Sequence, residues 1–283
     1  MIVPVPRDLY AVVGNPVGHS LSPAMMNAVF SSLHIPAVYI ALQVDSFADD
    51  LDTLTRMGFS GLSVTIPHKG AAFRLAAEMD ETARAIGAVN ALKRERGRWV
   101  GRNTDWIGST RALKQTTELD GKNVLVVGAG GAAKAVVYGL VKEGASVAVA
   151  NRTVDRGIAL AKQFPCEFIP LSELETLKAK RQFDVIVQCT SAGMAGMEPA
   201  PVFAASLFRP GMTVMDIVYR PLWTPFLTAA REAGCTIVDG VQMLLHQGVA
   251  QLEWWLGRPI PDENGVAVMR NALMEALRSG ENP

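Results

Sequence analysis

The sequence KNVLVVGAGGAA, residues 122–133, predicts a buried strand, a tight turn and the start of a helix. Apolar residues lead into the glycines, and a helix-forming run continues to Val141. Gly128, Gly130 and Ala133 occupy the positions of the G-x-G-x-x-G/A dinucleotide-binding pattern. There the first glycine permits the turn, the second lets the backbone approach a pyrophosphate, and the small third residue lets helix pack on strand. The first N–H groups of the helix would bind the phosphates.

A second apolar strand, expected at 146–150, indicates which dinucleotide binds. It ends in Asn151-Arg152-Thr153, where an NAD-binding protein usually carries a carboxylate for the ribose 2′-hydroxyl. The carboxylate is absent and Arg152 stands beside the position. A guanidinium pairs with a 2′-phosphate through forked, charge-assisted bonds, whereas a carboxylate would repel it. The sequence therefore favours NADP over NAD, the alternative being an ordinary surface arginine next to a glycine turn.

Length and charge limit the class of protein. The chain has 283 residues, of which 49% are hydrophobic, and this length predicts two domains, each with its own core. The formal net charge is zero, which argues against nucleic acid as a partner. The N-terminus does not have the pattern of a signal peptide. Because no apolar run is long enough to cross a bilayer, we expect no membrane association.

Cysteine and histidine usage predicts the compartment and the absence of a metal site. The 3 cysteines are scattered, which indicates reduced thiols and a cytoplasmic protein. The 4 histidines show no metal-ligand spacing, so we expect no bound metal.

The first hundred residues alternate strand and helix, which predicts an α/β domain with a mostly parallel sheet. The region lacks a glycine fingerprint of its own and is expected to bind the substrate. Its predicted strands are 9–13, 38–44, 62–66, 89–93 and 99–101, the last two of which could pair antiparallel, and its predicted helices are 23–33, 47–57, 68–79 and 81–86.

The second half predicts a Rossmann-like, doubly wound sheet that binds NADP. A helix at 105–116 leads into it, and its predicted strands are 124–127, 146–150, 167–169, 184–188, 213–217 and 236–238. Two final helices, 241–256 and 263–277, are expected to close back onto the first domain. The predicted division is 1–105 for the substrate-binding and catalytic domain, 106–240 for the NADP domain, and 241–283 for the C-terminal helices.

The residues after the first strand contain a candidate carboxylate receptor. Ser22 followed by Pro23 is a strong helix start, with serine as N-cap and proline at the first helical position. Together with Ser20, two hydroxyls at a helix N-terminus could bind a carboxylate. The equally good alternative is that Ser22 only caps its helix and Ser20 faces solvent.

Polar residues at three other strand ends could carry chemistry. Thr65 and Lys69 follow a strand, where open α/β sheets bind ligands, and a lysine there can act as general acid or base. A solvated lysine in a first helical turn is the alternative, and for that segment alone the better one. Asn90 enters a strand. Asp105 could serve the site or simply cap the helix after it.

Taken together, these segments resemble the shikimate dehydrogenase family over nearly the whole chain. The matching stretches are GNPVGHSLSP (14–23), SVTIPHK (63–69), GAVN (87–90), NTD (103–105), GAGGA (128–132), NRT (151–153), TSAGM (190–194), DIVYRP (216–221) and GVQMLLHQ (240–247).

The resemblance implies an NADP-dependent oxidoreductase that interconverts 3-dehydroshikimate and shikimate in chorismate and aromatic amino-acid biosynthesis. It also implies the roles of residues. Lys69 and Asp105 would be the catalytic pair. The substrate would be bound by Ser20, Ser22, Thr65, Lys69, Asn90, Asp105 and Gln247. The cofactor would be bound by Gly128, Ala129, Gly130, Gly131, Ala132, Asn151, Arg152, Thr153, Thr190, Met194, Tyr219 and Gly240.

Two departures from the family pattern leave the substrate range open. Ser63 stands where the family often has asparagine, and Ala91 where threonine is common. A dual-specificity quinate/shikimate dehydrogenase is therefore an alternative, although Ser20 and Ser22 together favour shikimate. A catalytically silent NADP-binding metabolite sensor is a third possibility. The sequence does not distinguish a monomer from a homodimer.

Overall fold

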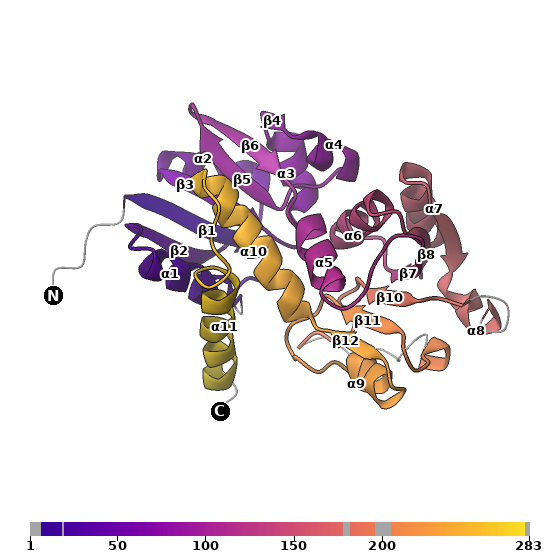
Figure 1. Ribbon diagram of the computed structural model, residues 1–283. Helices are drawn as coiled ribbons and strands as arrows, with labels where there is room; N and C mark the ends of the chain where they lie inside the picture. Colours follow the sequence, from indigo (N-terminus) through magenta and orange to yellow (C-terminus); the bar gives the residue numbers. More distant parts are fainter. Residues whose placement is uncertain (1–6, 19, 178–181, 196–204, 281–283) are drawn as a thin grey trace. The chain divides into compact units, whose positions relative to one another are not determined.

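The computed structural model describes residues 7–18, 20–177, 182–195 and 205–280. The chain forms two compact units, one of Met1–Thr104 with Gly248–Pro283 and the other of Asp105–Gln247 (Figure 1).

The first unit contains a six-stranded sheet of order β2-β1-β3-β5-β6-β4. Its strands are β1 (Asp8–Gly14), β2 (Ala37–Gln43), β3 (Phe59–Val64), β4 (Glu78–Met79), β5 (Ala91–Glu95) and β6 (Arg98–Arg102). β1 pairs in parallel with β2 and β3, and β4 with β6, whereas β5 is antiparallel to both of its neighbours. The expected antiparallel hairpin is confirmed.

The helices of the first unit are α1 (Ser22–Ser32), α2 (Phe47–Arg56), α3 (Lys69–Leu75), α4 (Glu81–Ile86), α11 (Val266–Gly280) and the second part of α10 (Gly240–Leu256). α1 packs on α11. Gly248 of α10 lies where a Cβ would be 2.9 Å from Met25 Cε, so α10 also packs closely on α1. Trp255 of α10 stacks on Tyr10 of β1 with ring centroids 4.9 Å apart.

One predicted helix of the first unit is too long. The pattern predicted helix over 68–79, but α3 ends at Leu75, and Ala76 is extended. Glu78 and Met79 form β4 and pair with Val100 and Gly101 of β6. The open edge of β6 binds this segment as a strand, and local helix preference does not decide its structure.

The second unit contains a parallel six-stranded sheet of order β12-β11-β10-β7-β8-β9. Its strands are β7 (Asn123–Val127), β8 (Ser146–Asn151), β9 (Glu167–Pro170), β10 (Val185–Gln188), β11 (Thr213–Asp216) and β12 (Thr236–Val238). In chain order this is the 3-2-1-4-5-6 arrangement of a Rossmann fold. The doubly wound sheet and all six predicted strands are confirmed.

The sheet of the second unit is buried on both faces. Val124 and Val126 of β7 belong to one core cluster, and Leu125 and Val127 belong to another. This is why the sequence of β7 is a continuous apolar run without alternation. Its helices are α5 (Asp105–Lys114), α6 (Gly131–Lys142), α7 (Val154–Gln163), α8 (Leu174–Leu177), α9 (Pro225–Glu232), the first part of α10, and the 3-10 helices η1 (Leu171–Glu173) and η2 (Ala205–Leu207).

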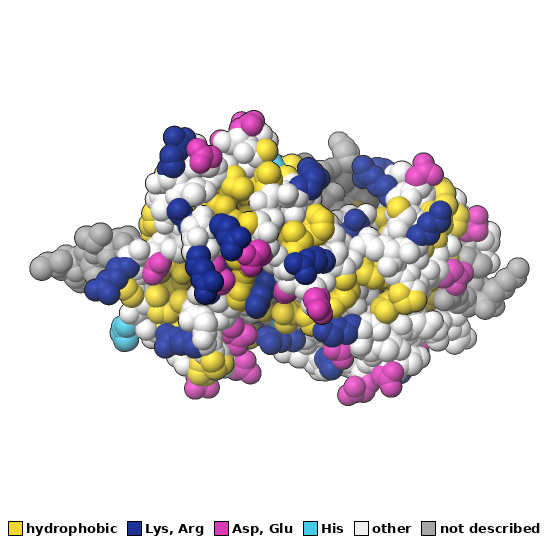
Figure 2. All heavy atoms as spheres, turned by 90° about the horizontal axis from the view of Figure 1, so that it is seen from above, with side chains coloured by type: hydrophobic (Ala, Val, Ile, Leu, Met, Phe, Trp, Pro, Cys, Tyr) yellow, Lys and Arg dark blue, Asp and Glu magenta, His cyan; other side chains and the backbone are white. Residues whose placement is uncertain are grey.

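Lys and Arg side chains are interspersed with Asp and Glu on the face drawn in Figure 2. In the described part of the chain, no helix combines the length and the apolar character needed to span a bilayer. Cys166, Cys189 and Cys235 are free thiols.

Candidate active site

Four loops of the first unit meet at one end of its strands, which we call the site edge of the sheet. β1 and β3 are parallel, so both end there, with Val13 paired to Val64. β5 is antiparallel to β3 and therefore begins at this edge, where Ala91 pairs with Ser63. β6 is antiparallel to β5 and ends at the same edge, where Arg102 pairs with Ala91. The start of β5 and the end of β6 therefore lie beside the carboxyl ends of β1 and β3.

Ser20 and Ser22 lie in the loop after β1 and at the start of α1. The expectation that Ser22 is the N-cap is wrong, because α1 already begins at Ser22 and Leu21 precedes it. Ser20 Oγ accepts the hydrogen bond from Ser22 N at 3.3 Å. Ser20 is partly buried and Ser22 is buried. Both hydroxyls therefore lie at the N-terminal end of an 11-residue helix, whose dipole favours an anion.

Thr65 and Lys69 follow β3 and are held by backbone bonds to neighbouring loops. Thr65 N donates to Val13 O at 3.0 Å. Lys69 is the first residue of α3, and its carbonyl accepts from Val89 N at 3.1 Å. A Cβ at Gly14 would collide with the Thr65 side chain, so the glycine of the first motif permits this close approach. Both side chains are partly buried at the site edge.

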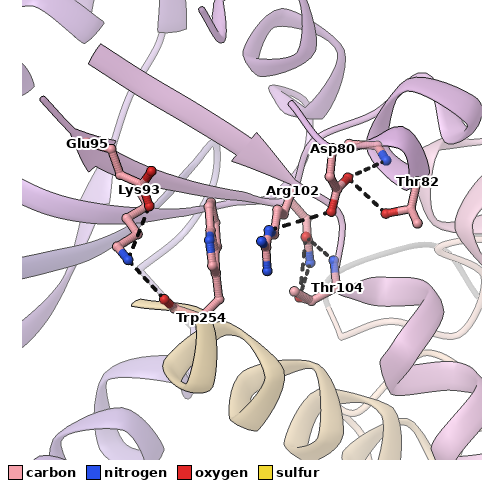
Figure 3. Close-up of polar contacts among 9 residues, drawn as sticks. Asp80, Thr82, Lys93, Glu95, Arg102, Thr104 and Trp254 are labelled. Atoms are coloured by element: carbon pink, nitrogen blue, oxygen red, sulfur yellow. Dashed lines mark hydrogen bonds and ion pairs between the residues drawn. The ribbon is translucent and has the colours of Figure 1, made fainter. Parts of the chain in front are cut away.

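Asn90 joins the start of β5 to the segment that follows β6. Asn90 Oδ1 accepts from Thr104 N at 2.7 Å, and Asn90 Nδ2 donates to Thr104 Oγ1 at 3.0 Å. Asn90 N donates to Arg102 O at 3.1 Å. Figure 3 shows Thr104 beside Arg102, whose guanidinium lies between the Trp254 ring and Asp80. Asn90 therefore holds the end of β6 in place, and it is also a candidate substrate-binding residue.

A buried polar network in the first unit was not found from the sequence. Tyr39 OH donates to Ser63 Oγ at 2.6 Å, and Ser63 Oγ donates to Gln251 Oε1. Gln251 Nε2 in turn donates to Thr104 Oγ1 at 3.3 Å. The signal available was the spacing of Gln251 four residues after Gln247, which places both on one face of α10.

The glycine turn of the second unit fits a pyrophosphate. Gly128 has a φ of 118°, which an L side chain rarely adopts, and its Cβ would lie 3.1 Å from Thr190 Cγ2. No atom lies within 4 Å of the position of a Gly130 Cβ among the described residues, so the space in front of α6 is open. Ala133 is buried in the core with Val124. The backbone therefore has the conformation, the open approach and the helix N-terminus that a dinucleotide phosphate requires.

The end of β8 fits a 2′-phosphate. Asn151 Nδ2 donates to Thr153 O at 2.8 Å, which shapes the turn between β8 and α7. The side chains of Arg152 and Thr153 are exposed there. An exposed guanidinium and hydroxyl at the carboxyl end of β8 are the groups that the phosphate of NADP needs.

Two further loops of the second unit contain the residues expected near the nicotinamide. Residues 189–194, which include Thr190 and Met194, follow β10, and residues 217–224, which include Tyr219, follow β11. Ala195 N donates to Arg220 O at 3.0 Å and connects the two loops. A Cβ at Gly240 would collide with the backbone of the second loop, so α10 begins directly against it. All four expected residues thus lie in adjoining segments.

Asp216 is the buried acid beneath these loops. It is the last residue of β11, and its carboxylate accepts hydrogen bonds from Val218 N at 2.9 Å and from Thr224 Oγ1 at 2.7 Å. Burial raises the pKa of Asp216 to about 6, and the two hydrogen bonds oppose this rise. The sequence placed Asp216 within a family motif but assigned it no role.

Asp105 and Gln247 are neighbours in the second unit. Asp105 is the buried first residue of α5, and Gly108 follows it by one helical turn. A Cβ at Gly108 would lie 2.7 Å from Met243 O and 2.8 Å from Gln247 Cβ. The close approach of α5 and α10 therefore places Gln247 beside the first turn of α5.

The expected site residues form two sets, one in each unit. Ser20, Ser22, Thr65, Lys69 and Asn90 share the site edge of the first unit. The second unit contains Asp105, Gln247 and the cofactor set, which includes Ala129, Gly131 and Ala132 of the glycine turn.

Three family models match the chain in order. They are the shikimate dehydrogenase substrate binding domain over residues 12–92, shikimate / quinate 5-dehydrogenase over 110–218, and the shikimate 5'-dehydrogenase C-terminal domain over 240–274. Shikimate dehydrogenase (NADP(+)) of Syntrophobacter fumaroxidans is 58% identical over 282 residues, covering 100% of this chain and 99% of the relative. The protein of the same name from Methanothrix thermoacetophila is 42% identical and covers 94% and 97%.

Solved structures of shikimate and quinate dehydrogenases have the same fold. Shikimate 5-dehydrogenase from Thermus thermophilus, in complex with NADP(H) and shikimate, aligns with a TM-score of 0.83 at 35% identity, covering 95% of this chain and 99% of that one. Quinate dehydrogenase from Corynebacterium glutamicum, in complex with NAD, aligns with a TM-score of 0.84 at 30% identity and covers 95% and 99%.

Proposed function

Because the chain belongs to the shikimate dehydrogenase family, we propose that it catalyses the reversible, NADP-dependent reduction of 3-dehydroshikimate to shikimate. The observation that carries this function is the 58% identity to an NADP-dependent shikimate dehydrogenase over the whole chain. The fold is consistent with this function. The Rossmann unit has an arginine at the position of the 2′-phosphate, and the other unit has hydroxyls, an amide and a lysine together at one end of its strands. The quinate alternative is not favoured, because the curated relatives described above act with NADP on shikimate by name.

The cofactor is held by the second unit. The Gly128 turn and the start of α6 would bind the pyrophosphate, and Asn151, Arg152 and Thr153 the 2′-phosphate. Thr190, Met194, Tyr219 and Gly240 would lie around the nicotinamide. Bound NADPH supplies the hydride that the ketone carbon accepts.

The substrate is held by its carboxylate and its ring hydroxyls. Ser20 and Ser22, at the N-terminal end of α1, would bind the carboxylate. The ring hydroxyls would bind to Thr65, Lys69, Asn90, Asp105 and Gln247.

Lys69 and Asp105 form the catalytic pair in this proposal. Reduction of the ketone develops alkoxide character on its oxygen. The Lys69 ammonium would stabilise that charge and deliver the proton. Asp105 would keep Lys69 oriented and charged, and would accept a hydrogen bond from a ring hydroxyl.

Replacement of Lys69 tests the mechanism. Lys69→Ala should lower kcat by at least about 10²-fold with little change in substrate affinity, because a positioned proton donor contributes roughly 10²–10⁴ in rate. Lys162→Ala, on the exposed side of α7, is the matched control and should leave both constants unchanged. A retained kcat with a raised KM would show that Lys69 only binds substrate.

One absorbance assay separates the candidate functions. NADP or NAD is combined with shikimate or quinate, and formation of reduced cofactor is followed. Turnover of shikimate with NADP supports the proposal, whereas turnover of quinate at a similar rate would indicate dual specificity. Cofactor binding without turnover of either substrate would indicate a sensor.

The compartment and the oligomeric state extend the proposal. We expect the enzyme to be cytoplasmic, and the three free thiols are compatible with a reducing compartment. A monomer or a homodimer is expected, and light scattering on the purified protein decides between them.

A further inference from the structure

Gln188 and Asp216 are polar residues at the ends of two neighbouring buried strands. They are the last residues of β10 and β11 and pair directly with each other in the parallel register. Both are 0% exposed. Burial of an amide and a carboxylate is unfavourable unless hydrogen bonds satisfy them. The hydrogen-bond partners of Gln188 and Asp216 therefore indicate the role of each side chain.

Gln188 closes the loop that follows β10. Its Nε2 donates to Thr190 O at 3.3 Å and to Ala192 O at 3.2 Å. Its Oε1 accepts from Thr190 N. These bonds go to main-chain atoms of one loop, so a single amide determines the path of the backbone through Thr190.

Asp216 closes the loop that follows β11 at both ends. Its hydrogen bond from Val218 N holds the start of the loop, and the bond from Thr224 Oγ1 holds its end. Thr224 is also the N-cap of α9 and accepts from Leu227 N at 3.2 Å. Tyr219 lies between the two attachment points.

The two closed loops are joined to each other and to the glycine turn. Ile217 N donates to Gln188 O at 3.1 Å, in addition to the bond between Ala195 and Arg220. Thr190 packs against Gly128, and Cys189 N donates to Val127 O at 2.8 Å. The backbone around Thr190 and Tyr219 is thus held relative to the turn expected to bind the pyrophosphate.

We propose that Gln188 and Asp216 are positioning residues for the nicotinamide half of the cofactor. They act through the loops of Thr190 and Tyr219 and set the position of the nicotinamide ring for hydride transfer. This inference rests on the proposed function. Reaction rate is sensitive to such geometry, since a misplacement of about 1 Å can cost about 10²-fold.

The variants separate loop positioning from general folding. Asp216→Ala removes both attachments of its loop. Asp216→Asn keeps them, because its carbonyl oxygen can accept from Val218 N and its amide can donate to Thr224 Oγ1. Gln188→Glu retains the shape of the side chain but cannot donate to the carbonyls of Thr190 and Ala192.

The readouts are steady-state kinetics, the isotope effect with NADPH deuterated at the transferred hydrogen, and the affinity for 2′-phospho-ADP-ribose. This fragment lacks the nicotinamide but retains the groups for the Gly128 turn and Arg152. Asp216→Ala and Gln188→Glu should lower kcat by about 10²-fold and raise the isotope effect, because hydride transfer becomes slower. Fragment affinity should change less than about twofold, and Asp216→Asn should recover kcat to within about tenfold of the wild type.

Equal loss of fragment affinity and of turnover would overturn the inference, as would variants with unchanged kcat. If Asp216→Ala does not fold, Thr224→Val removes one attachment and Thr224→Ser is its matched control, with the same expected contrast. Wild-type turnover of shikimate is measured first in the same assay. Its absence would refute the proposed function and this inference together, whereas normal wild-type turnover with unchanged variants would refute only the inference.

Discussion

The two units secure their strand-end loops in different ways. In the first unit, Ser63 bonds to Gln251, which lies 188 residues further along the chain. In the second unit, Gln188 bonds to residues two and four positions ahead, and Asp216 to residues two and eight ahead. The loops of the second unit are therefore held by side chains a few residues away in sequence. The strand-end residue Ser63 of the first unit is instead held by α10, near the end of the chain.

Because of this difference, we expect broken hydrogen bonds to lower mainly stability in the first unit and mainly catalysis in the second. Short-range bonds close small loops at a small cost in chain entropy and affect mainly the loop itself. Long-range bonds form only when the sheet and α10 have already packed, so breaking them should weaken the whole unit. The following variants test this contrast.

The largest expected change is in the pH dependence of stability, and it comes from burial of the Asp216 carboxyl group and not from its short-range hydrogen bonds, which oppose it. The pKa of Asp216 in the folded protein is about 6, against an ordinary value of 3.8, so between these values the folded state binds more protons than the unfolded state. The protonated Asp216 carboxyl group contributes to the free energy of unfolding fully below pH 3.8, and this contribution is lost as pH rises through 6. The total loss is about 3 kcal/mol, at about 1.4 kcal/mol per pKa unit. Urea unfolding of wild type and Asp216→Asn at pH 4.5 and 7 should show a smaller decline in the variant. Parallel declines would contradict the prediction.

Gln251→Leu should lower the free energy of unfolding by about 2 kcal/mol, because it leaves the buried Ser63 and Thr104 hydroxyls without one of their partners. Thermal unfolding of Gln251→Leu, Ser63→Ala and the double variant measures the coupling between the two sites. The double variant should lose less stability than the sum of the losses in the two single variants, because each single variant already breaks the shared bond. Additive effects would show that the bond contributes nothing.

Arg152→Ala should raise KM for NADP by about tenfold or more and leave KM for NAD unchanged, because only the former carries the 2′-phosphate. Lys162→Ala, an exposed cation in the last turn of α7, is the control. The free energy of unfolding should stay the same in both variants. A matched rise in KM for NAD would mean that Arg152 contacts another part of the cofactor.

Arg102→Ala should give the smallest change, about 0.5–1 kcal/mol of stability at low salt. The guanidinium lies 4.7 Å from the centre of the Trp254 ring and 3.6 Å from Asp80, and it is partly exposed (Figure 3). Arg98→Ala, at the other end of β6, breaks an exposed ion pair with Glu78. Equal effects of the two variants would leave no contribution for the cation–π contact.

The strands of the second sheet and the position of the glycine turn could be predicted because their signals are local. A buried strand, a glycine with positive φ and a small helix residue each occur within a few positions. The length of α3 and the start of α1 could not be predicted in this way. Segment 78–79 becomes a strand only because β6 offers it an open edge. Ser20, not Ser22, accepts a backbone N–H at the start of α1, because the helix begins one residue before the position that proline suggests.

The candidate site was likewise only partly predictable. Arg152 stands out because it lies at a strand end where NAD-binding proteins usually carry a carboxylate. Lys69 and Asp105 received their roles only through the family resemblance, since a solvated lysine and a helix cap explain the two residues equally well or better by themselves. Tyr39, Gln188 and Gln251 carry no such signal, since a buried amide or phenol looks like ordinary polarity in an apolar segment.

The amino-acid sequence alone determined the two-domain α/β organisation, because chain length and the alternation of strands and helices indicate it. It also determined the dinucleotide turn and the preference for NADP, because each of these depends on residues adjacent in the chain. Only the tertiary structure decided which polar residues are buried and what they bind. Burial and hydrogen-bond partners depend on contacts between segments as much as 188 residues apart, as between Ser63 and Gln251, and no local pattern encodes those contacts.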